Sequence, residues 1–239
     1  MPEKQQKTEE DHLAETRDAM ISAAMTHVPF DGWSEETFHA AMRDSGVAMG
    51  LAHLAFPRGV LDLALAFHRQ GDCEMVQRMQ TADLASLRYS ARVATGVRFR
   101  IEAIPDREVA RRSITFFSTP HHASEGSAAI WGTADLIWKT LGDRSDDLNW
   151  YSKRAILSAV YASTLLYWLG DESVEHSDTW QFLDRRIGNV MQFEKFKSGV
   201  RDNPFFQGFM RGPGRLLERI TAPNPRGKNE LPGFMAEKR

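Results

Sequence analysis

The sequence predicts an all-α protein of about ten helices. Apolar residues recur at helical spacing along almost the whole 239-residue chain, and the alternation typical of half-buried strands is nearly absent. Breaks that contain Gly or Pro divide this pattern into segments of helix length. A chain of this length can bury a sizeable core without a metal or a disulfide. It has one cysteine, Cys73, which fits a reducing compartment and to which we assign no chemistry.

The predicted helices follow from the apolar spacing and the breaks in turn. The second helix opens at Ser34, since serine is a favoured helix cap. A long helix over residues 73–99 is expected to face the core with five residues, Met75, Met79, Leu84, Leu87 and Tyr89. The other helices are expected at residues 11–28, 47–56, 57–69, 105–118, 124–141, 149–169, 173–197 and 204–220.

Residues 43–59 have the layout of a helix-turn-helix, with a turn at 44–46 and a break at Phe56 and Pro57. A DNA-reading helix needs side chains that neutralise phosphates and bond base edges. Residues 47–56 contain no Lys, Arg, Asn, Gln, Ser or Thr, and residues 11–69 hold eight acidic residues against four arginines, a net charge of −4. The sequence therefore predicts no specific nucleic-acid binding.

The opposite end of the chain is basic. From Lys195 to the last residue, the sequence contains ten Lys and Arg residues and four Asp and Glu residues, which gives a net charge of +6. On a helix, the apolar residues of the stretch 203–220 fall on one side and its arginines on the other, which predicts binding to an anionic membrane surface. The alternative is a final helix that covers the core. The expected membrane-binding residues are Phe205, Phe206, Phe209, Met210, Arg211, Arg215, Leu216, Leu217, Arg219 and Ile220.

The sequence shows no pattern for a metal, a cofactor or catalysis. Glu-x-x-His pairs occur at Glu9 and His12 and at Glu36 and His39, but without the helical partners that a di-iron bundle requires. The pair His121 and His122 lacks a third spaced ligand. No Gly-rich phosphate loop or nucleophile motif occurs either. We expect neither a cofactor nor a metal and no catalytic residue, so the protein is predicted not to be an enzyme.

Three stretches resemble the ubiquinone-biosynthesis accessory proteins of the Coq-nine family. They are AAMTHVPFDGWSEE at 23–36, GDRSDDLNWYSKRAILSAVYASTLLYWLGD at 142–171 and DTWQFLDRRIGNV at 178–190. The head also resembles TetR-type regulators, with Gly50, Phe56 and Pro57 at the places of their motif. Their usual lysines and tyrosines are replaced by Met49, His53, Ala55 and Gly59.

The resemblance implies a TetR-like homodimer with a degenerate helix-turn-helix head and a larger helical ligand-binding region. Such a protein binds isoprenoid or phospholipid chains and presents a quinone precursor to a di-iron demethoxyubiquinone hydroxylase at the membrane. It implies a disordered head at 1–10, a helix-turn-helix subdomain at 11–70, a lipid-binding and dimerisation region at 71–198, a membrane-seeking helix at 199–221 and a basic tail at 222–239. The alternatives are a ligand-responsive TetR-type transcription regulator and, third, an enzyme.

The resemblance also assigns residues. The residues expected to contact the hydroxylase are Asn149, Trp150, Tyr151 and Arg154. The alternative is that the aromatic pair closes the preceding loop over the core. The lipid-binding candidates, which spacing alone would place in an ordinary core, are Met75, Met79, Phe116, Phe117, Trp131, Ile137, Trp138, Leu157, Val160, Tyr161, Leu165, Trp168 and Phe182.

The first ten residues lack both an apolar signal core and the Arg-rich, acid-poor character of a transit peptide. The longest apolar run, 155–169, has fifteen residues and is short for a bilayer span. These observations give the expectation of a cytoplasmic protein that is peripheral to a bacterial inner membrane.

Overall fold

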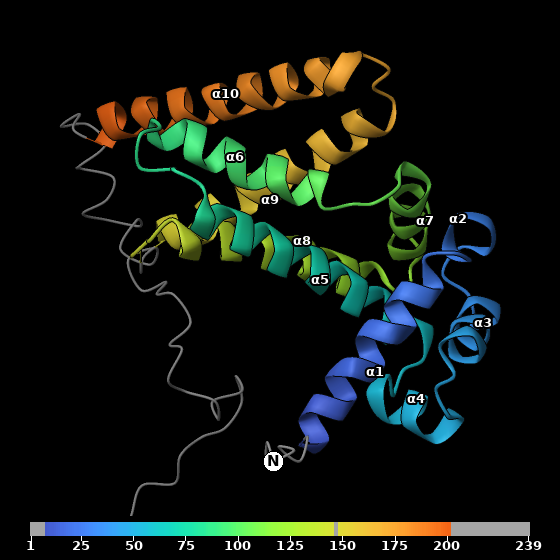
Figure 1. The fold of residues 1–239 in the computed structure, drawn as a ribbon. Coiled ribbons are helices and arrows are strands. Elements are labelled where there is room, and N and C mark those ends of the chain that lie inside the picture. Colours follow the sequence, from blue (N-terminus) through green and yellow to red (C-terminus); the bar gives the residue numbers. More distant parts are fainter. Residues whose placement is uncertain (1–7, 146–147, 202–239) are drawn as a thin grey trace, which may run out of the picture.

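The computed structural model of the chain describes residues 8–145 and 148–201. Over these residues the protein has ten α-helices, one short 3-10 helix at Val174–His176 and no strand, so the all-α prediction is confirmed. A head of four helices lies at one end of a longer helical body (Figure 1). The head comprises α1 (Glu9–Ala24), α2 (Val28–Asp31), α3 (Glu35–Ser45) and α4 (Met49–Ala55). The body comprises α5 (Val60–Thr81), α6 (Tyr89–Glu102), α7 (Arg107–Phe117), α8 (Ala123–Thr140), α9 (Leu148–Leu169) and α10 (Ser177–Arg201).

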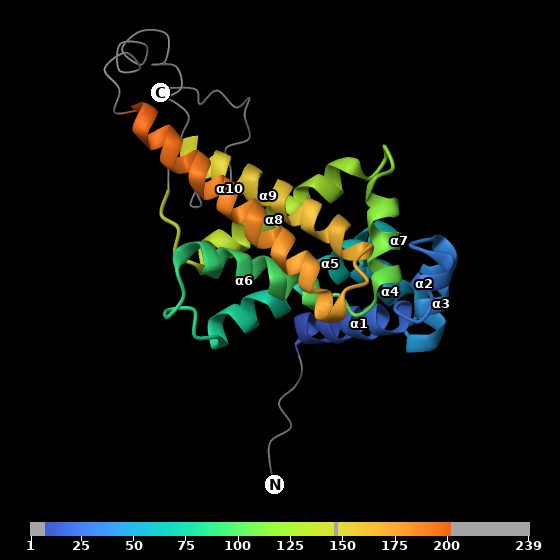
Figure 2. The same cartoon turned by 90° about the horizontal axis from the view of Figure 1, so that it is seen from above.

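Helix α5 joins the two parts because it packs on α1 and α3 in the head and on α6 and α8 in the body. Each part has its own apolar core. The head core is built around Met20 and Phe38, and the body core around Met75, Ile137 and Tyr161. Helix α10 lies along α6 and α9, on the side of the body away from α5 (Figures 1 and 2). The body therefore forms a layered bundle with the head packed at one end.

The first predicted helix, 11–28, is corrected at both ends. It begins at Glu9 because the Thr8 hydroxyl and the Asp11 carboxylate cap each other's backbone amides. It ends at Ala24, and Pro29 then sits at the start of the separate helix α2, where its missing amide hydrogen does no harm. The predicted cap at Ser34 is confirmed, since its hydroxyl accepts a hydrogen bond from the Thr37 amide.

The predicted bounds of the helices 57–69 and 73–99 are wrong. One helix, α5, runs from Val60 to Thr81, and a loop separates it from α6. This loop is held by the Arg92 guanidinium, which donates to the carbonyl oxygens of Ala85 and Leu87. Met75 and Met79 are buried as expected, but Leu87 and Tyr89 are 37% and 43% exposed because they lie in or beside the loop. Leu84 packs at the margin of the body core.

The later helices agree with their predicted ranges to within a few residues. Between α9 and α10, the buried carboxylate of Asp171 accepts hydrogen bonds from the amides and hydroxyls of both Ser173 and Thr179. Burial raises the pKa of Asp171, but these four bonds outweigh it and hold the pKa below its ordinary value. The predicted helix 204–220 and all ten membrane-binding candidates lie outside the described residues.

Candidate functional site

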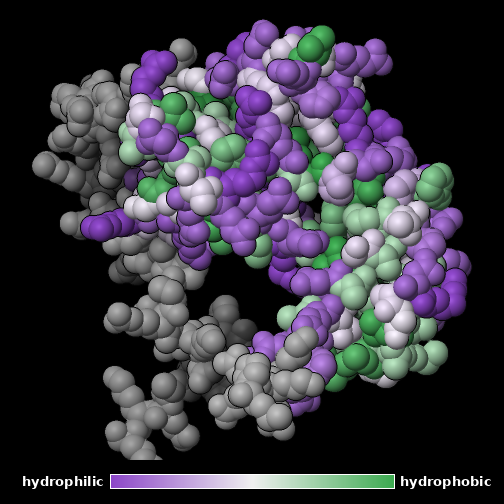
Figure 3. All heavy atoms as spheres, viewed as in Figure 1, coloured by the Kyte–Doolittle hydropathy of each residue, from purple (hydrophilic) through white to green (hydrophobic). Residues whose placement is uncertain are grey.

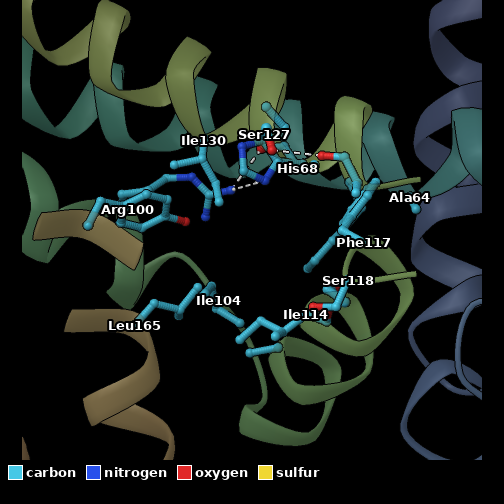
Figure 4. A pocket seen from close by; sticks show the side chains of 17 residues that line it. Ala64, His68, Arg100, Ile104, Ile114, Phe117, Ser118, Ser127, Ile130 and Leu165 are labelled. Atoms are coloured by element: carbon cyan, nitrogen blue, oxygen red, sulfur yellow. Dashed lines mark hydrogen bonds between the residues drawn. The ribbon is translucent and has the colours of Figure 1, made fainter. Parts of the chain in front are cut away.

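A cavity of about 290 Å³ lies in the body, between α5, α6, α7, α8 and α9. In Figure 4, Arg100 and His68 meet along one wall, and Ile104, Ile114 and Leu165 lie across the cavity from them. Most of the lining is apolar. The lining residues are Ala64, Phe67, His68, Arg100, Ile104, Ala110, Ser113, Ile114, Phe117, Ser118, Ala123, Gly126, Ser127, Ala129, Ile130, Tyr161 and Leu165. This composition suits an apolar ligand with a small number of polar groups.

The polar wall is a buried network centred on Arg100, which is 4% exposed. Its Nε donates to Asp72 Oδ1 at 2.7 Å, and its Nη2 donates to the carbonyl oxygen of His68 at 3.0 Å and to His68 Nδ1 at 3.1 Å. The hydroxyl of Thr133 donates to Asp72 Oδ1 at 2.8 Å and lies 3.0 Å from His68 Nε2. Arg100 and Asp72 therefore form an ion pair whose charges cancel inside the protein.

The same geometry fixes the protonation of His68. Because Nδ1 faces the N–H groups of Arg100, it accepts, and the ring proton lies on Nε2, from which it is donated to the Thr133 hydroxyl. Burial, followed by the charge of Arg100, lowers the pKa of His68 to about 4. Burial likewise raises the pKa of Tyr161, so both rings are neutral at physiological pH.

Two glycines allow the helices to approach at this site. A Cβ atom on Gly71 would lie 2.8 Å from Arg100 Nη1, so a larger residue there would displace the guanidinium from its place against α5. A Cβ atom on Gly126 would lie 2.7 Å from Phe117 Cβ, where α8 meets α7. The ion pair and the cavity wall both depend on these close contacts.

The structure brings three of the lipid-binding candidates to the cavity, namely Phe117, Tyr161 and Leu165. Seven others fill the adjacent body core and do not line the cavity: Met75, Met79, Ile137, Trp138, Leu157, Val160 and Trp168. Phe116 packs against the head core, and Trp131 and Phe182 are half-buried away from the cavity. Lipid contact by any of these residues stays a prediction.

Sequence reasoning missed the polar wall. A signal was present, since His68 and Asp72 stand four residues apart on one helix and therefore share a face. Arg100 is the charged residue that lies among Val97, Ile101 and their apolar neighbours, yet charged residues at such positions usually reach solvent. Only the packing of α6 on α5 shows that these three side chains meet.

The predicted docking residues lie at the start of α9. Trp150 and Tyr151 are both half-buried and stack edge to face, with ring centroids 4.7 Å apart. Neither ring belongs to the apolar core cluster of the body, which agrees with the expectation that neighbouring helix positions cannot both face the interior. Asn149 is half-buried beside them. These three residues can therefore present part of their surface to a partner.

Arg154 differs from the other docking candidates because it is 1% exposed. Its Nε donates to Asp135 Oδ1 at 2.6 Å, and its Nη1 donates to Asp143 Oδ2 at 3.3 Å and to the Trp150 carbonyl oxygen at 3.1 Å. Its guanidinium carbon lies 4.0 Å from the centroid of the Trp150 ring. Arg154 is thus not a surface contact as expected, and instead holds Trp150 in place.

The head presents an apolar surface where a DNA-binding domain would be basic. In the face shown in Figure 3, hydrophobic residues gather over the head. Phe30, Met49 and Leu54 are 78%, 59% and 56% exposed, and the last two belong to α4, the helix in the recognition position. Helix α4 carries no Lys or Arg, the side chains that bind phosphates most strongly.

The described part of the chain offers neither a metal-binding cluster nor a single membrane-spanning helix. It contains no group of three or more His, Cys, Asp or Glu side chains that could hold a metal ion. No single helix there is long and apolar enough to cross a membrane, and α4 and α5 reach that criterion only as a pair bent by 59°.

The fold and the family emerge from comparison with known proteins. A TetR transcriptional regulator from Nitrosomonas europaea superposes with a TM-score of 0.61 at 21% identity, over 74% of this chain and 99% of that chain, which confirms the TetR-like fold. The family model for COQ9 matches residues 123–194. The human ubiquinone biosynthesis protein COQ9 is 27% identical over 91% of this chain and 72% of its own length. The rat protein is 29% identical over 91% and 73%, and the Dictyostelium discoideum protein is 26% identical over 77% and 62%.

The chain is similar to the COQ9 family. The resemblance found in the sequence is thereby confirmed, and the family match covers α8, α9 and the described docking residues. The expected localisation is wrong. The human, Dictyostelium, rat and Drosophila COQ9 proteins that the chain is similar to are all named as mitochondrial, which contradicts the expected bacterial inner membrane.

Proposed function

We propose that this protein is a non-catalytic accessory protein of ubiquinone biosynthesis that holds part of an isoprenoid or phospholipid molecule in its body cavity. One observation carries the proposal, the cavity of about 290 Å³ with its mostly apolar lining. That volume lies just below the usual range of ligand pockets, which is about 300 to 1,000 Å³. It suits one part of a long-chain lipid, with the remainder of the chain outside.

The free energy of such a ligand would be nearly the same in the protein cavity as in a membrane. Burying apolar surface contributes about 25 cal/mol per Å² relative to water. The bilayer offers the same contribution, so only a small difference in free energy separates the two states. A protein of this kind can therefore take up a lipid and release it again without an energy source.

The proposal includes delivery to a partner. The half-buried Trp150 and Tyr151 rings, held by the buried Arg154, form a rigid aromatic patch of the kind that dominates binding at protein interfaces. We propose the di-iron demethoxyubiquinone hydroxylase as the protein that docks there, with the quinone precursor as its substrate. A homodimer and attachment of the stretch 203–220 to an anionic membrane belong to the same proposal.

A transcription regulator is less well supported, although the fold is compatible with one. The head carries a net charge of −4 over residues 11–69, and α4 exposes Met49 and Leu54 instead of base-reading side chains. Phosphate neutralisation supplies most of the non-specific affinity for DNA, and this head lacks the charge for it.

Filling the cavity tests the proposal. The substitution Ile114→Trp places a larger apolar side chain in the cavity wall, so we expect at least about a tenfold loss of affinity for fluorescently labelled geranylgeraniol, or about 1.4 kcal/mol. The melting temperature should not fall, because the added ring fills empty space. Titration of the labelled alcohol measures the affinity.

The control is Thr115→Trp, at the next position of α7 and exposed to solvent. It should bind the labelled alcohol as the unchanged protein does. Equal affinity in all three proteins would show that the alcohol does not enter this cavity, and the proposed function would then lose its main support.

A further inference from the structure

Helix α7 forms part of the cavity wall, yet little apolar packing holds it in place. Ser113, Ile114 and Phe117 line the cavity, and the last two are seen in Figure 4. Of the eleven residues of α7, only Val109 and Ala110 are buried. Elements with few buried apolar side chains open more readily than the core does. The polar contacts of α7 therefore decide how often it moves away from the cavity.

Hydrogen bonds tie α7 to the C-terminal end of α9. Arg107 Nη2 donates to the carbonyl oxygen of Asp171 at 2.6 Å, and Arg111 Nη2 donates to that of Leu169 at 3.3 Å. The last carbonyl oxygens of a helix have no partner within the helix and attract cations. Because Arg107 is the first residue of α7, its contact fixes the beginning of that helix.

A histidine completes this contact. His176 belongs to the short 3-10 helix between α9 and α10, and its Nδ1 lies 2.6 Å from Arg107 Nη2. A guanidinium group only donates hydrogen bonds, so Nδ1 accepts one and carries no proton. The His176 ring also meets the Trp168 ring edge to face, with ring centroids 5.9 Å apart. His176 can therefore hold Arg107 only while its ring is neutral.

The backbone at His176 is strained. Glu175 and His176 both have left-handed conformations, with φ of 54° and 57°, which residues with a Cβ atom rarely adopt. Such conformations persist only where the surrounding contacts hold them, and they are frequent in switch regions. Loss of the contact between His176 and Arg107 would allow this turn to relax.

We propose that His176 is a proton-sensitive latch on α7. The neutral ring holds Arg107 and keeps α7 against the cavity. An imidazolium ring offers no acceptor and repels the guanidinium, so protonation releases α7 and speeds the exchange of ligand. An anionic membrane concentrates protons at its surface, so the latch opens more often where the protein meets one. The effect on ligand exchange rests on the proposed function, whereas the movement of α7 does not.

The other groups around the His176 ring leave it as the one that responds to neutral and mildly acidic pH. On α7, Arg107 stays charged, and α9 presents the uncharged Trp168. The hydrogen bonds to Asp171 outweigh its burial and hold its pKa below the ordinary value, so this carboxylate stays ionised. Glu175 in the turn and Asp178 on α10 are exposed to solvent, which screens their charges.

Hydrogen exchange of the full chain, corrected for the intrinsic effect of pH, tests the latch. From pH 8 to pH 6 the amides of residues 111–117 should lose at least about tenfold in protection, because an opening that takes up one proton grows by up to about tenfold per pH unit. His68 on the cavity wall does not contribute, since burial and the charge of Arg100 lower its pKa to about 4.

Three variants locate the effect. His176→Asn keeps an acceptor oxygen and suits the left-handed backbone but takes up no proton, so its α7 protection should not depend on pH. Arg107→Met removes the donor and should make α7 exchange as rapidly at pH 8 as at pH 6, so the proposal stays testable if His176→Asn does not fold. The matched control is His39→Asn, an exposed histidine on α3, which should respond to pH as the unchanged protein does.

The outcomes separate the latch from the proposed function. Equal pH dependence of α7 protection in the unchanged protein and in His176→Asn would overturn the latch, and so would an unchanged protein whose α7 protection is the same at pH 8 and pH 6. Labelled geranylgeraniol should dissociate about threefold or more faster at pH 6 from the unchanged protein, but not from His176→Asn. If α7 exchanges as expected and no geranylgeraniol binds, the latch is supported and the proposed function fails.

Discussion

Replacing Arg154 by methionine is expected to lower the free energy of unfolding by about 3 kcal/mol, because the change removes a buried guanidinium that bridges the carboxylates of Asp135 and Asp143. The side chain of Asp143 is 3% exposed and that of Asp135 is 17% exposed, and both accept hydrogen bonds from the Arg154 guanidinium. The value lies at the lower end for a broken buried pair because Lys153 still reaches Asp143 and Lys139 still reaches Asp135. Urea unfolding followed by circular dichroism measures it.

A matched control is Arg111→Met, since the Arg111 side chain is 54% exposed and pairs with Glu108 on the surface. Exposed pairs of this kind contribute about 0 to 1 kcal/mol. If the two variants lose the same free energy of unfolding, the buried ion pairs of Arg154 do not stabilise the fold more than an exposed pair does. Arg154 would then be a candidate docking contact.

The second large effect is expected at the aromatic patch. Trp150→Ala should weaken association with the demethoxyubiquinone hydroxylase by about 1 to 4 kcal/mol, because truncating an aromatic anchor removes most of its contact area with the partner. The fold should survive, since Trp150 is half-buried and stands outside the body core. Surface plasmon resonance with the purified hydroxylase gives the affinity, and a thermal melt gives the stability.

Tyr167→Ala is the control for Trp150, because Tyr167 is 40% exposed on the same helix and stacks on Phe182, far along α9 from the patch. It should leave the affinity unchanged. A Trp150→Ala protein that unfolds at much lower temperature, and loses binding only in proportion to its folded fraction, would show that the aromatic pair serves to close the loop before α9.

The sequence predicts the fold class well because helical periodicity is a local property. The cap at Ser34 and the ranges of α8 and α9 follow from residues near them in the chain. The break between α5 and α6 was missed for a related reason. The loop 82–88 contains neither Gly nor Pro, and the Arg92 guanidinium that stabilises it acts through hydrogen bonds that spacing does not reveal.

The site is less accessible to such reasoning because its parts come from separate helices. Apolar spacing selects core residues such as Ile137 and Leu157 as readily as cavity residues such as Tyr161, since both kinds face inward. The Arg100 ion pair required knowledge of which helices pack together. Family resemblance supplied the expected ligand class, and it assigned a docking role to Arg154, whose side chain the packing buries.

The central claim, that the body cavity holds an apolar lipid, is tested most directly by native mass spectrometry of the full chain purified without detergent. We predict a bound species with the mass of a prenylated or acylated lipid, present on the unchanged protein and on Thr115→Trp and lost from Ile114→Trp. A protein that carries no such species, and takes none up when incubated with a polyprenyl quinone, would contradict the account.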